Sequence, residues 1–422
     1  MTATAESTES EFLSGNNTLK SRLRRAERMR KLWALALIAP MFIFLVIGFI
    51  IPIISLLKLS VEDLEVGEAL PRTVEAFREW DGEGFPPPEA LEIFAEELVI
   101  SDENKSLGSA TRRLNYAFSG FKSMLKKTGR EAEEKLVGLP PDQILDGFIA
   151  IDKDWGNPEY WLAIKDAVGP LSDFYFLWAV DRQRDEEGNI IQRPEDQSIY
   201  IDVLLRTLEI SIAVTALCFL LGLPIAYLLA TLPPSKSNLL LILVLLPFWT
   251  SLLVRTTAWI VLLQNQGLIN DMGILLGFWD EPLELIRNRI GVYIAMVHIQ
   301  LPFMILPIYA VMKGINPWHM RAAESLGAHR WLAFFKVYLP QCLPGIGAGI
   351  LLCFILSLGY YITPALVGGP QDQMISFWIV ENMGRVLNWG LAAALSVILL
   401  GITLIFFFIY NRFVGFDKLR MG

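Results

Sequence analysis

The chain has 422 residues, of which 53% are hydrophobic and 19% charged, and its mean hydropathy is +0.44. Soluble domains are usually about 45–50% apolar and about 25% charged, so this composition favours a membrane protein. Residues 61–202 contain 31 acidic and 15 basic residues, a net charge of −16, whereas the remainder carries +8. These figures exclude a single globular enzyme, a disordered protein and a nucleic-acid-binding protein, which needs a continuous basic face.

Six stretches are nearly free of charge and long enough to cross a bilayer as helices, which satisfy their own backbone hydrogen bonds in lipid. In chain order they are Leu32–Leu57, Ile210–Thr231, Leu239–Leu263, Ile290–Met312, Leu343–Val367 and Leu387–Tyr410. The first exceeds the apolar core of a signal peptide and lacks a small-residue cleavage site after it, so we expect it to be retained. The sequence therefore predicts an all-α polytopic membrane protein with six transmembrane helices in a lipid bilayer.

Basic residues near the ends of the spans predict the orientation. Fifteen of them lie in the N-terminal tail, after the second and fourth spans and after the last one. The two short loops on the other side hold three, which are Arg287, Arg289 and Arg385. We therefore expect both termini in the cytoplasm, with the long acidic segment on the opposite, outer side.

This topology divides the chain into five parts. They are a basic cytoplasmic tail (1–31), the first transmembrane helix (32–57), an acidic periplasmic insert domain (58–203), a five-helix core (204–416) and a cytoplasmic tail (417–422). The insert is expected to be mainly helical α+β, with helices at Ala90–Leu98, Thr111–Lys127 and Pro158–Val168 and a hairpin of Phe174–Asp181 with Asn189–Gln192. Cys218, Cys342 and Cys353 lie in apolar runs and are expected to be buried thiols.

The most informative segment is the loop 314–340 between the fourth and fifth spans. Asn316 followed by Pro317 is a typical helix start, and Gly327 is a typical helix end because glycine adopts the left-handed conformation cheaply. A second helix follows at once and enters the membrane beyond Pro340. The short first helix would lie across the cytoplasmic face and either contact a partner protein or rest on lipid headgroups.

Small and apolar side chains on this helix favour a partner. Ala322 and Ala323 allow close approach to the backbone, and the apolar anchors are Trp318, Met320 and Leu326. The run Ala322-Ala323-x-x-Leu326-Gly327-Ala328, followed after eight residues by Val337-x-Leu339-Pro340, resembles the "EAA" loop of ABC-importer permeases.

That resemblance implies the type I ABC importer permease fold, with a coupling helix that docks in a cleft of the ATPase subunit. The residues it assigns to ATPase coupling are Arg321, Ala322, Ala323, Glu324, Leu326, Gly327, Leu339 and Pro340. Arg321 occupies the position of the family's leading Glu, so an ionic contact made by that Glu has no counterpart here.

Two further segments are similar to the spermidine/putrescine branch of this family. They are Leu246–Trp259 with Gln266–Asn270, and Tyr361–Gly369 with Met374–Ser376. The resemblance covers roughly residues 200–416 and implies a bacterial inner-membrane location. The implied partners are two ABC ATPase subunits, a second permease subunit of a different chain and a periplasmic solute-binding protein. Members of this branch have a much shorter first outer loop, so the insert departs from the pattern.

The chain contains no GxxxxGKS or GxxxxGKT motif, so ATP hydrolysis is expected on a separate subunit and no cofactor is expected here. His298, His319 and His329 show no metal-ligand spacing, and no catalytic constellation is evident. A membrane-embedded enzyme is therefore disfavoured, and a receptor or secretion scaffold with a working ectodomain remains as an alternative class.

A polyamine would need carboxylates and aromatic faces along its path. The candidate pathway residues are Glu209, Trp249, Arg255, Tyr360, Tyr361 and Glu381. Structural roles compete with each assignment: Arg255 can tie two helices, Glu209 can pair with Arg206 one turn earlier, and the aromatics can simply pack. The predicted function is a polyamine permease; alternatives are permeases for a phosphonate, an opine or an amino-acid-like solute.

Overall fold

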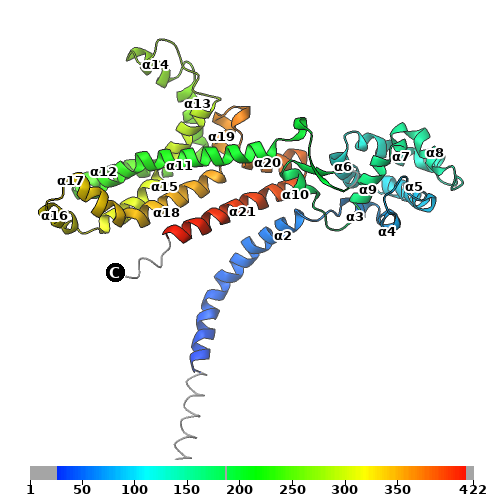
Figure 1. Cartoon of the computed structure of the whole chain (residues 1–422), viewed down its shortest axis with the longest axis horizontal. Helices are drawn as coiled ribbons and strands as arrows, with labels where there is room; N and C mark the ends of the chain where they lie inside the picture. Colours follow the sequence, from blue (N-terminus) through cyan, green and yellow to red (C-terminus); the bar gives the residue numbers. More distant parts are fainter. Residues whose placement is uncertain (1–25, 186–187, 415–422) are drawn as a thin grey trace, which may run out of the picture. The chain divides into compact units, whose positions relative to one another are not determined.

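The computed structural model describes residues 26–185 and 188–414, and these are almost entirely helical (Figure 1). Five described helices are long and apolar enough to cross a membrane, and a strongly bent helix pair makes a sixth crossing if it is counted as one span. The first helix, Ala26–Leu59, contains an 18-residue window with a mean hydropathy of 2.9, and all but its last residue belongs to a unit that ends at Lys58. The predicted all-α membrane architecture is confirmed.

The remaining spans form a core in which three helices pack side by side (Figure 1). They are α11 (Tyr200–Thr231), α15 (Arg289–Gly314) and α18 (Leu339–Leu358). Glycines allow this close approach, because a Cβ on Gly222 would lie 3.0 Å from Cγ of Met304 and one on Gly349 would lie 2.8 Å from its Sδ. Small residues at helix contacts are the usual means of packing in lipid, where apolar burial offers little driving force.

Several polar side chains inside the core bond along their own helix. On α11 the hydroxyls of Thr207, Ser211 and Thr215 each donate to the carbonyl four residues earlier, at 2.7 Å. Such bonds give each of these three hydroxyls a partner in the apolar interior. All three cysteines are buried free thiols, as the apolar runs around them predicted.

The third predicted span is not one straight helix. The chain forms α12 (Pro234–Leu245), a 3₁₀ turn (Leu246–Trp249), α13 (Leu252–Leu263) and α14 (Leu268–Leu275), with a bend of 100° between the two halves. Pro247 removes a backbone donor at the turn, and Ser251 starts the next helix by accepting a hydrogen bond from Val254 N at 3.2 Å. The expectation of a single helix over Leu239–Leu263 was therefore wrong.

The fifth predicted span, Leu343–Val367, is displaced toward the N-terminus. A continuous helical stretch runs from Arg330 to Leu358 through α17 (Arg330–Ala333) and a π-helical turn, and Gly359 ends it. The residues that follow form α19 (Ile362–Val367) and α20 (Ile375–Glu381) before the last span, α21 (Trp389–Val414). Hydropathy alone cannot separate a span from short apolar helices that follow it, which explains the error.

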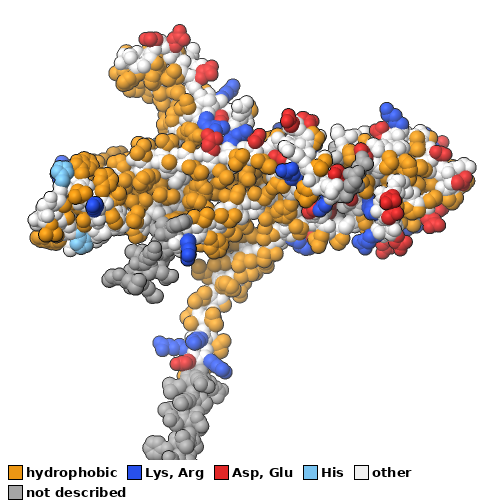
Figure 2. Space-filling view, viewed as in Figure 1, with side chains coloured by type: hydrophobic (Ala, Val, Ile, Leu, Met, Phe, Trp, Pro, Cys, Tyr) orange, Lys and Arg blue, Asp and Glu red, His pale blue; other side chains and the backbone are white. Residues whose placement is uncertain are grey.

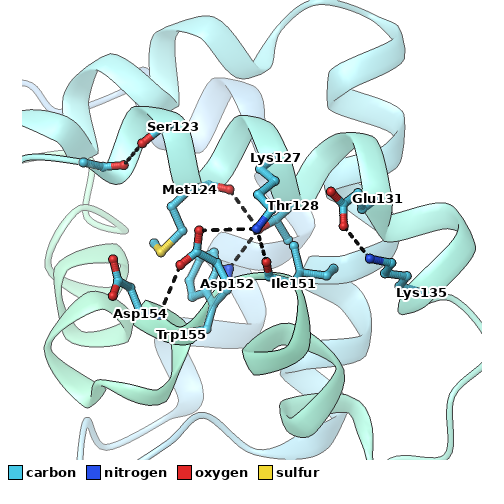
Figure 3. A network of polar contacts seen from close by, with 11 residues as sticks. Ser123, Met124, Lys127, Thr128, Glu131, Lys135, Ile151, Asp152, Asp154 and Trp155 are labelled. Carbon is cyan, nitrogen blue, oxygen red and sulfur yellow. Dashed lines mark hydrogen bonds and ion pairs between the residues drawn. The ribbon is translucent and has the colours of Figure 1, made fainter.

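Residues 59–199, called the insert below, are mainly helical. The helices are α3 (Glu65–Ala69), α4 (Pro71–Glu79), α5 (Pro88–Glu103), α6 (Leu107–Ala117), α7 (Phe121–Lys135), α8 (Ile144–Ile151), α9 (Pro158–Asp166) and α10 (Phe174–Ala179). They enclose a buried core centred on Trp155 and Trp161, whose rings lie 4.4 Å apart. Trp155 Nε1 donates to Thr128 Oγ1 at 2.8 Å, one of the polar contacts beneath α7 in Figure 3. Each indole is thus buried with its polar atom paired.

Two expectations for the insert were wrong in detail. Thr111–Lys127 is broken at Gly120, whose φ is +101°, and Asn115 Oδ1 accepts hydrogen bonds from the backbone on the far side of the break. Phe174–Asp181 forms a helix rather than a strand, and the hairpin pairs β1 (Arg182–Arg184) with β2 (Ile190–Gln192) instead. Aromatic residues favour strands, but tertiary packing of α10 overrides that preference.

The insert joins the core through α10 and the residues that follow it. Tyr175 packs against α21 at Gly390, where any side chain would collide with its ring. Asp181 caps α11, because its carboxylate accepts hydrogen bonds from the backbone of Ile199, Tyr200 and Ile201 at 2.7–3.1 Å. The two regions differ at the surface: charged side chains gather over the insert, and apolar side chains cover the core (Figure 2).

Candidate functional site

The loop 314–340 contains a short, well-capped helix, α16 (Trp318–Ser325). Asn316 Oδ1 accepts a hydrogen bond from Trp318 N at 3.0 Å, which satisfies a free donor at the helix start. At the other end Gly327 has a φ of +88°, and Ala328 N bonds back to Ala323 O at 3.0 Å. This is the glycine-terminated helix end that the sequence predicted.

Much of this helix is exposed. Trp318 is 65% exposed and Leu326 89%, while Ala322 and Glu324 also face outward. Met320 differs, because it is partly buried against the apolar core of the spans and is not available as an anchor. The guanidinium of Arg321 lies 5.0 Å above the Trp318 ring, so at this position the cation contacts an aromatic face of its own helix.

Two connections hold α16 to the span that follows. The first is a side-chain contact, in which His319 Nδ1 lies 2.8 Å from Gln341 Oε1 of α18. Gln341 is itself held in place, because its Nε2 donates to Val337 O at 2.7 Å one turn earlier. The turn after Gly327 leads directly into the helical stretch that begins at Arg330, where Leu339 is partly buried and Pro340 is exposed. A displacement of α16 would therefore be transmitted to α18 through short bonded links.

The candidate pathway residue Glu209 does not pair with Arg206. Its Oε2 accepts from Arg289 Nη1 at 2.8 Å, and Arg289 Nε donates to Asp372 Oδ1 at 2.9 Å. Arg206 instead donates to the backbone carbonyl of Gln373 at 3.3 Å. The Arg289 guanidinium thus joins α11 and α15 to the turn between α19 and α20. Each acid is at least 80 residues from Arg289 in the sequence, so sequence patterns alone could not predict this cluster.

Arg255 lies near the start of α13. Trp259 Nε1 donates to His298 Nδ1 at 3.1 Å. Arg255 Nε and Nη1 are buried and have no hydrogen-bond partner within residues 26–185 and 188–414. One structural role considered for Arg255 was to tie two helices together. No carboxylate on the described part of the chain makes such a link with it.

The other candidate residues are scattered. Tyr361 lies 6.3 Å from the Phe377 ring, Trp249 is 76% exposed at the bend of the third span, and Glu381 pairs with Arg385 one turn later at 3.0 Å. The structure therefore leaves Glu209 and Glu381 in separate ion pairs. Three further residues, Arg289, Asp372 and His298, join the candidate residues because the structure shows their contacts. In the sequence they are only isolated polar residues next to or inside apolar runs.

Comparison with known proteins places this arrangement in a family. Residues 218–415 match the family model "Binding-protein-dependent transport system inner membrane component". The spermidine/putrescine transport system permease protein PotB of Haemophilus influenzae is 34% identical over 214 residues, covering 51% of this chain and 75% of the relative. The inner membrane ABC transporter permease protein YdcU of Escherichia coli is 32% identical over 230 residues, covering 52% and 73%.

A solved bacterial alginate ABC transporter, in complex with an alginate pentasaccharide-bound periplasmic protein, is similar at 18% identity and a TM-score of 0.43, covering 53% of this chain and 80% of that one. The insert lies outside the stretch that the family model matches. Identity with the two permeases extends over most of their own length. The chain therefore belongs to the family of binding-protein-dependent transport system inner membrane components, as a multi-pass permease subunit of an ABC importer rather than an enzyme.

Proposed function

We propose that this permease imports a polyamine such as spermidine or putrescine, delivered by a periplasmic solute-binding protein and driven by ATP hydrolysis on separate subunits. The substrate class is supported by relatives named as spermidine/putrescine permeases in Haemophilus influenzae and Escherichia coli, the latter 32% identical over 80% of its length. A second permease, a different chain, would complete the pathway, and two ATPase subunits would bind below.

The loop 314–340 is the proposed ATPase contact. Of the residues assigned to coupling, Arg321, Ala322, Glu324, Leu326 and Gly327 are exposed on or beside α16. Ala323, Leu339 and the exposed Pro340 complete the turn into α18. This exposed, capped helix, bonded to a span, is the observation that carries the proposal. Fifteen basic residues on this side of the spans support placing it, with both termini, in the cytoplasm.

Residues 58–203 would then form a periplasmic domain that precedes the core at 204–416. The tails of the chain, 1–31 and 417–422, would lie in the cytoplasm. The insert's own buried core supports independent packing of this region, and its net negative charge suits a position beside the path of a cationic solute. Its contacts with α11 and α21 fix it to the core at the ends of these spans.

Substitution of Gly327 tests the coupling assignment. Gly327→Val forces a β-branched residue into φ +88°, which should distort the end of α16 and uncouple ATP hydrolysis from transport. In proteoliposomes containing all subunits, we expect ATP-dependent spermidine uptake to fall at least about tenfold while ATP hydrolysis persists.

Gly314→Val is the matched control, because Gly314 is also exposed in this loop, has open space around its Cα and lacks a positive φ. Its uptake should stay close to that of the unmodified protein. Normal uptake by Gly327→Val would show that α16 is not the coupling helix.

An anionic or amino-acid-like solute is the rival substrate, and Arg255 favours it. Its two buried nitrogen atoms have no partner on the described part of the chain and would gain hydrogen bonds from a phosphonate or carboxylate. Uptake measured in parallel with labelled spermidine, a phosphonate and an amino acid decides between these classes.

A further inference from the structure

We propose that the carboxylates of Glu209 and Asp372 form a binding site for an ammonium group of the imported solute, and that the guanidinium of Arg289 is the resident cation that this group replaces. The inference rests on the proposed import of a polyamine and names where such a solute meets this chain.

Two carboxylates converge on one guanidinium, so the cluster carries a net charge of −1. The Glu209 and Asp372 oxygens lie 2.8 and 2.9 Å from nitrogen atoms of Arg289. The three side chains are 60%, 8% and 31% exposed, respectively. A solute can therefore reach the cluster from the Glu209 side, whereas Asp372 is enclosed and would hold a bound cation in a less hydrated setting.

The Asp372 carboxylate does not depend on Arg289 for its position. Asp372 Oδ2 also accepts a hydrogen bond from Gly369 N at 3.0 Å, which fixes the buried carboxylate within its own turn. Glu209 lies on α11, and Thr207 of the same helix accepts a hydrogen bond from Ile375 N at 2.8 Å. The helix that carries Glu209 would therefore stay beside the segment that carries Asp372 after the guanidinium has left.

The two carboxylates supply the attraction that holds Arg289, because it is the first residue of α15, where the positive end of the helix dipole disfavours a cation. Tyr293 follows one turn later on the same helix. Carboxylates and aromatic faces are the groups that recognise alkylammonium ligands.

Replacement of Arg289 has a consequence for the spans. Its guanidinium links α11 and α15 to the turn after α19, and an ammonium held by the two acids would release α15 from that link. The Thr207–Ile375 bond would keep α11 attached to the turn. Solute arrival would thus loosen one helix of the core while leaving the others joined.

The experiment measures binding of radiolabelled spermidine to the complete transporter complex in nanodiscs, without the solute-binding protein. Glu209→Gln should weaken binding about tenfold because a charge-assisted bond is lost. Arg289→Gln should strengthen binding several-fold because the competing cation is gone. Glu281→Gln, an exposed acid in the loop before α15, should leave binding unchanged.

The opposite signs separate a binding site from a structural tie. If the cluster only holds the helices together, Glu209→Gln and Arg289→Gln remove the same bond and shift binding in the same direction, which overturns the inference. If the unmodified complex binds no spermidine but imports another solute with ATP, the site assignment is wrong and the importer assignment stands. If no solute is imported with ATP, the proposed function itself fails.

Discussion

The insert and the permease core solve the burial of polar groups in different ways. In the insert, charged groups are buried in complementary sets: Arg113 donates three hydrogen bonds of 2.5–3.0 Å to the Asp63 carboxylate, and Glu97 accepts three hydrogen bonds at the start of α4. In the core, three hydroxyl groups on α11 bond to carbonyls of the same helix, and glycines replace side chains where helices meet. Polar groups on one span can thus be satisfied before the spans pack, and the ion pairs of Arg289 add a link between distant charges.

The largest expected effect comes from breaking the buried pair of the insert. Arg113 and Asp63 are 2% and 0% exposed, and Arg113 also lies 3.8 Å above the Phe174 ring. Arg113→Met should destabilise the insert by about 3–5 kcal/mol, because it leaves a buried carboxylate without a partner. Unfolding followed by tryptophan fluorescence measures this change.

The double variant Arg113→Met with Asp63→Leu is the control, since it removes both charges. It should recover most of the lost stability. If the double variant is no more stable than the single one, packing of the Arg113 stem rather than its charge holds this region together.

A smaller effect is expected from filling a glycine contact in the core. Gly349→Ala places a methyl group 2.8 Å from Met304 Sδ and 3.0 Å from its carbonyl oxygen, so α15 and α18 must separate slightly. A loss of about 1–3 kcal/mol is expected, measured as a lower midpoint of thermal unfolding in detergent. Gly401→Ala on α21 is the matched control, because nothing lies within 4 Å of its new methyl group. Equal effects of the two substitutions would argue against close packing as the role of Gly349.

The smallest effect concerns Glu65 in the insert. Burial raises the pKa of its carboxyl group above the usual value, although nearby arginines oppose this, and its Oε2 has no partner on the described part of the chain. A raised pKa means that the native state favours the protonated acid, so the stabilising contribution is present at low pH and disappears as pH rises through the folded-state pKa.

Glu65→Gln should therefore stabilise the insert by about 1 kcal/mol at pH 7 and have little effect near pH 4. Urea unfolding at the two pH values provides the measurement. A stabilisation that is equal at both would exclude ionisation of Glu65 as its cause.

Sequence patterns predicted what depends on neighbouring residues. The apolar runs gave the membrane architecture, and Asn316, Pro317 and Gly327 gave a helix whose ends are as expected. Sequence patterns gave wrong predictions where a contact depends on residues far apart in the chain. The partner of Glu209 is Arg289, 80 residues away, although Arg206 is the nearest cation along the chain.

Two other errors have the same origin. Phe174–Ala179 contains strand-forming aromatics, yet its packing on α21 makes it a helix. Met320 has the apolar character of an anchor for a partner, but the fold turns it toward the spans. Such choices depend on tertiary surfaces that periodicity does not describe.

The cap at Asp181 sets a limit on how this permease could be shortened. Three backbone donors at the start of α11 depend on a carboxylate that belongs to the insert side of the chain. A deletion of the insert that includes Asp181 would remove this acceptor from the start of α11, the first span of the core. In this chain the insert thus supplies the beginning of the span.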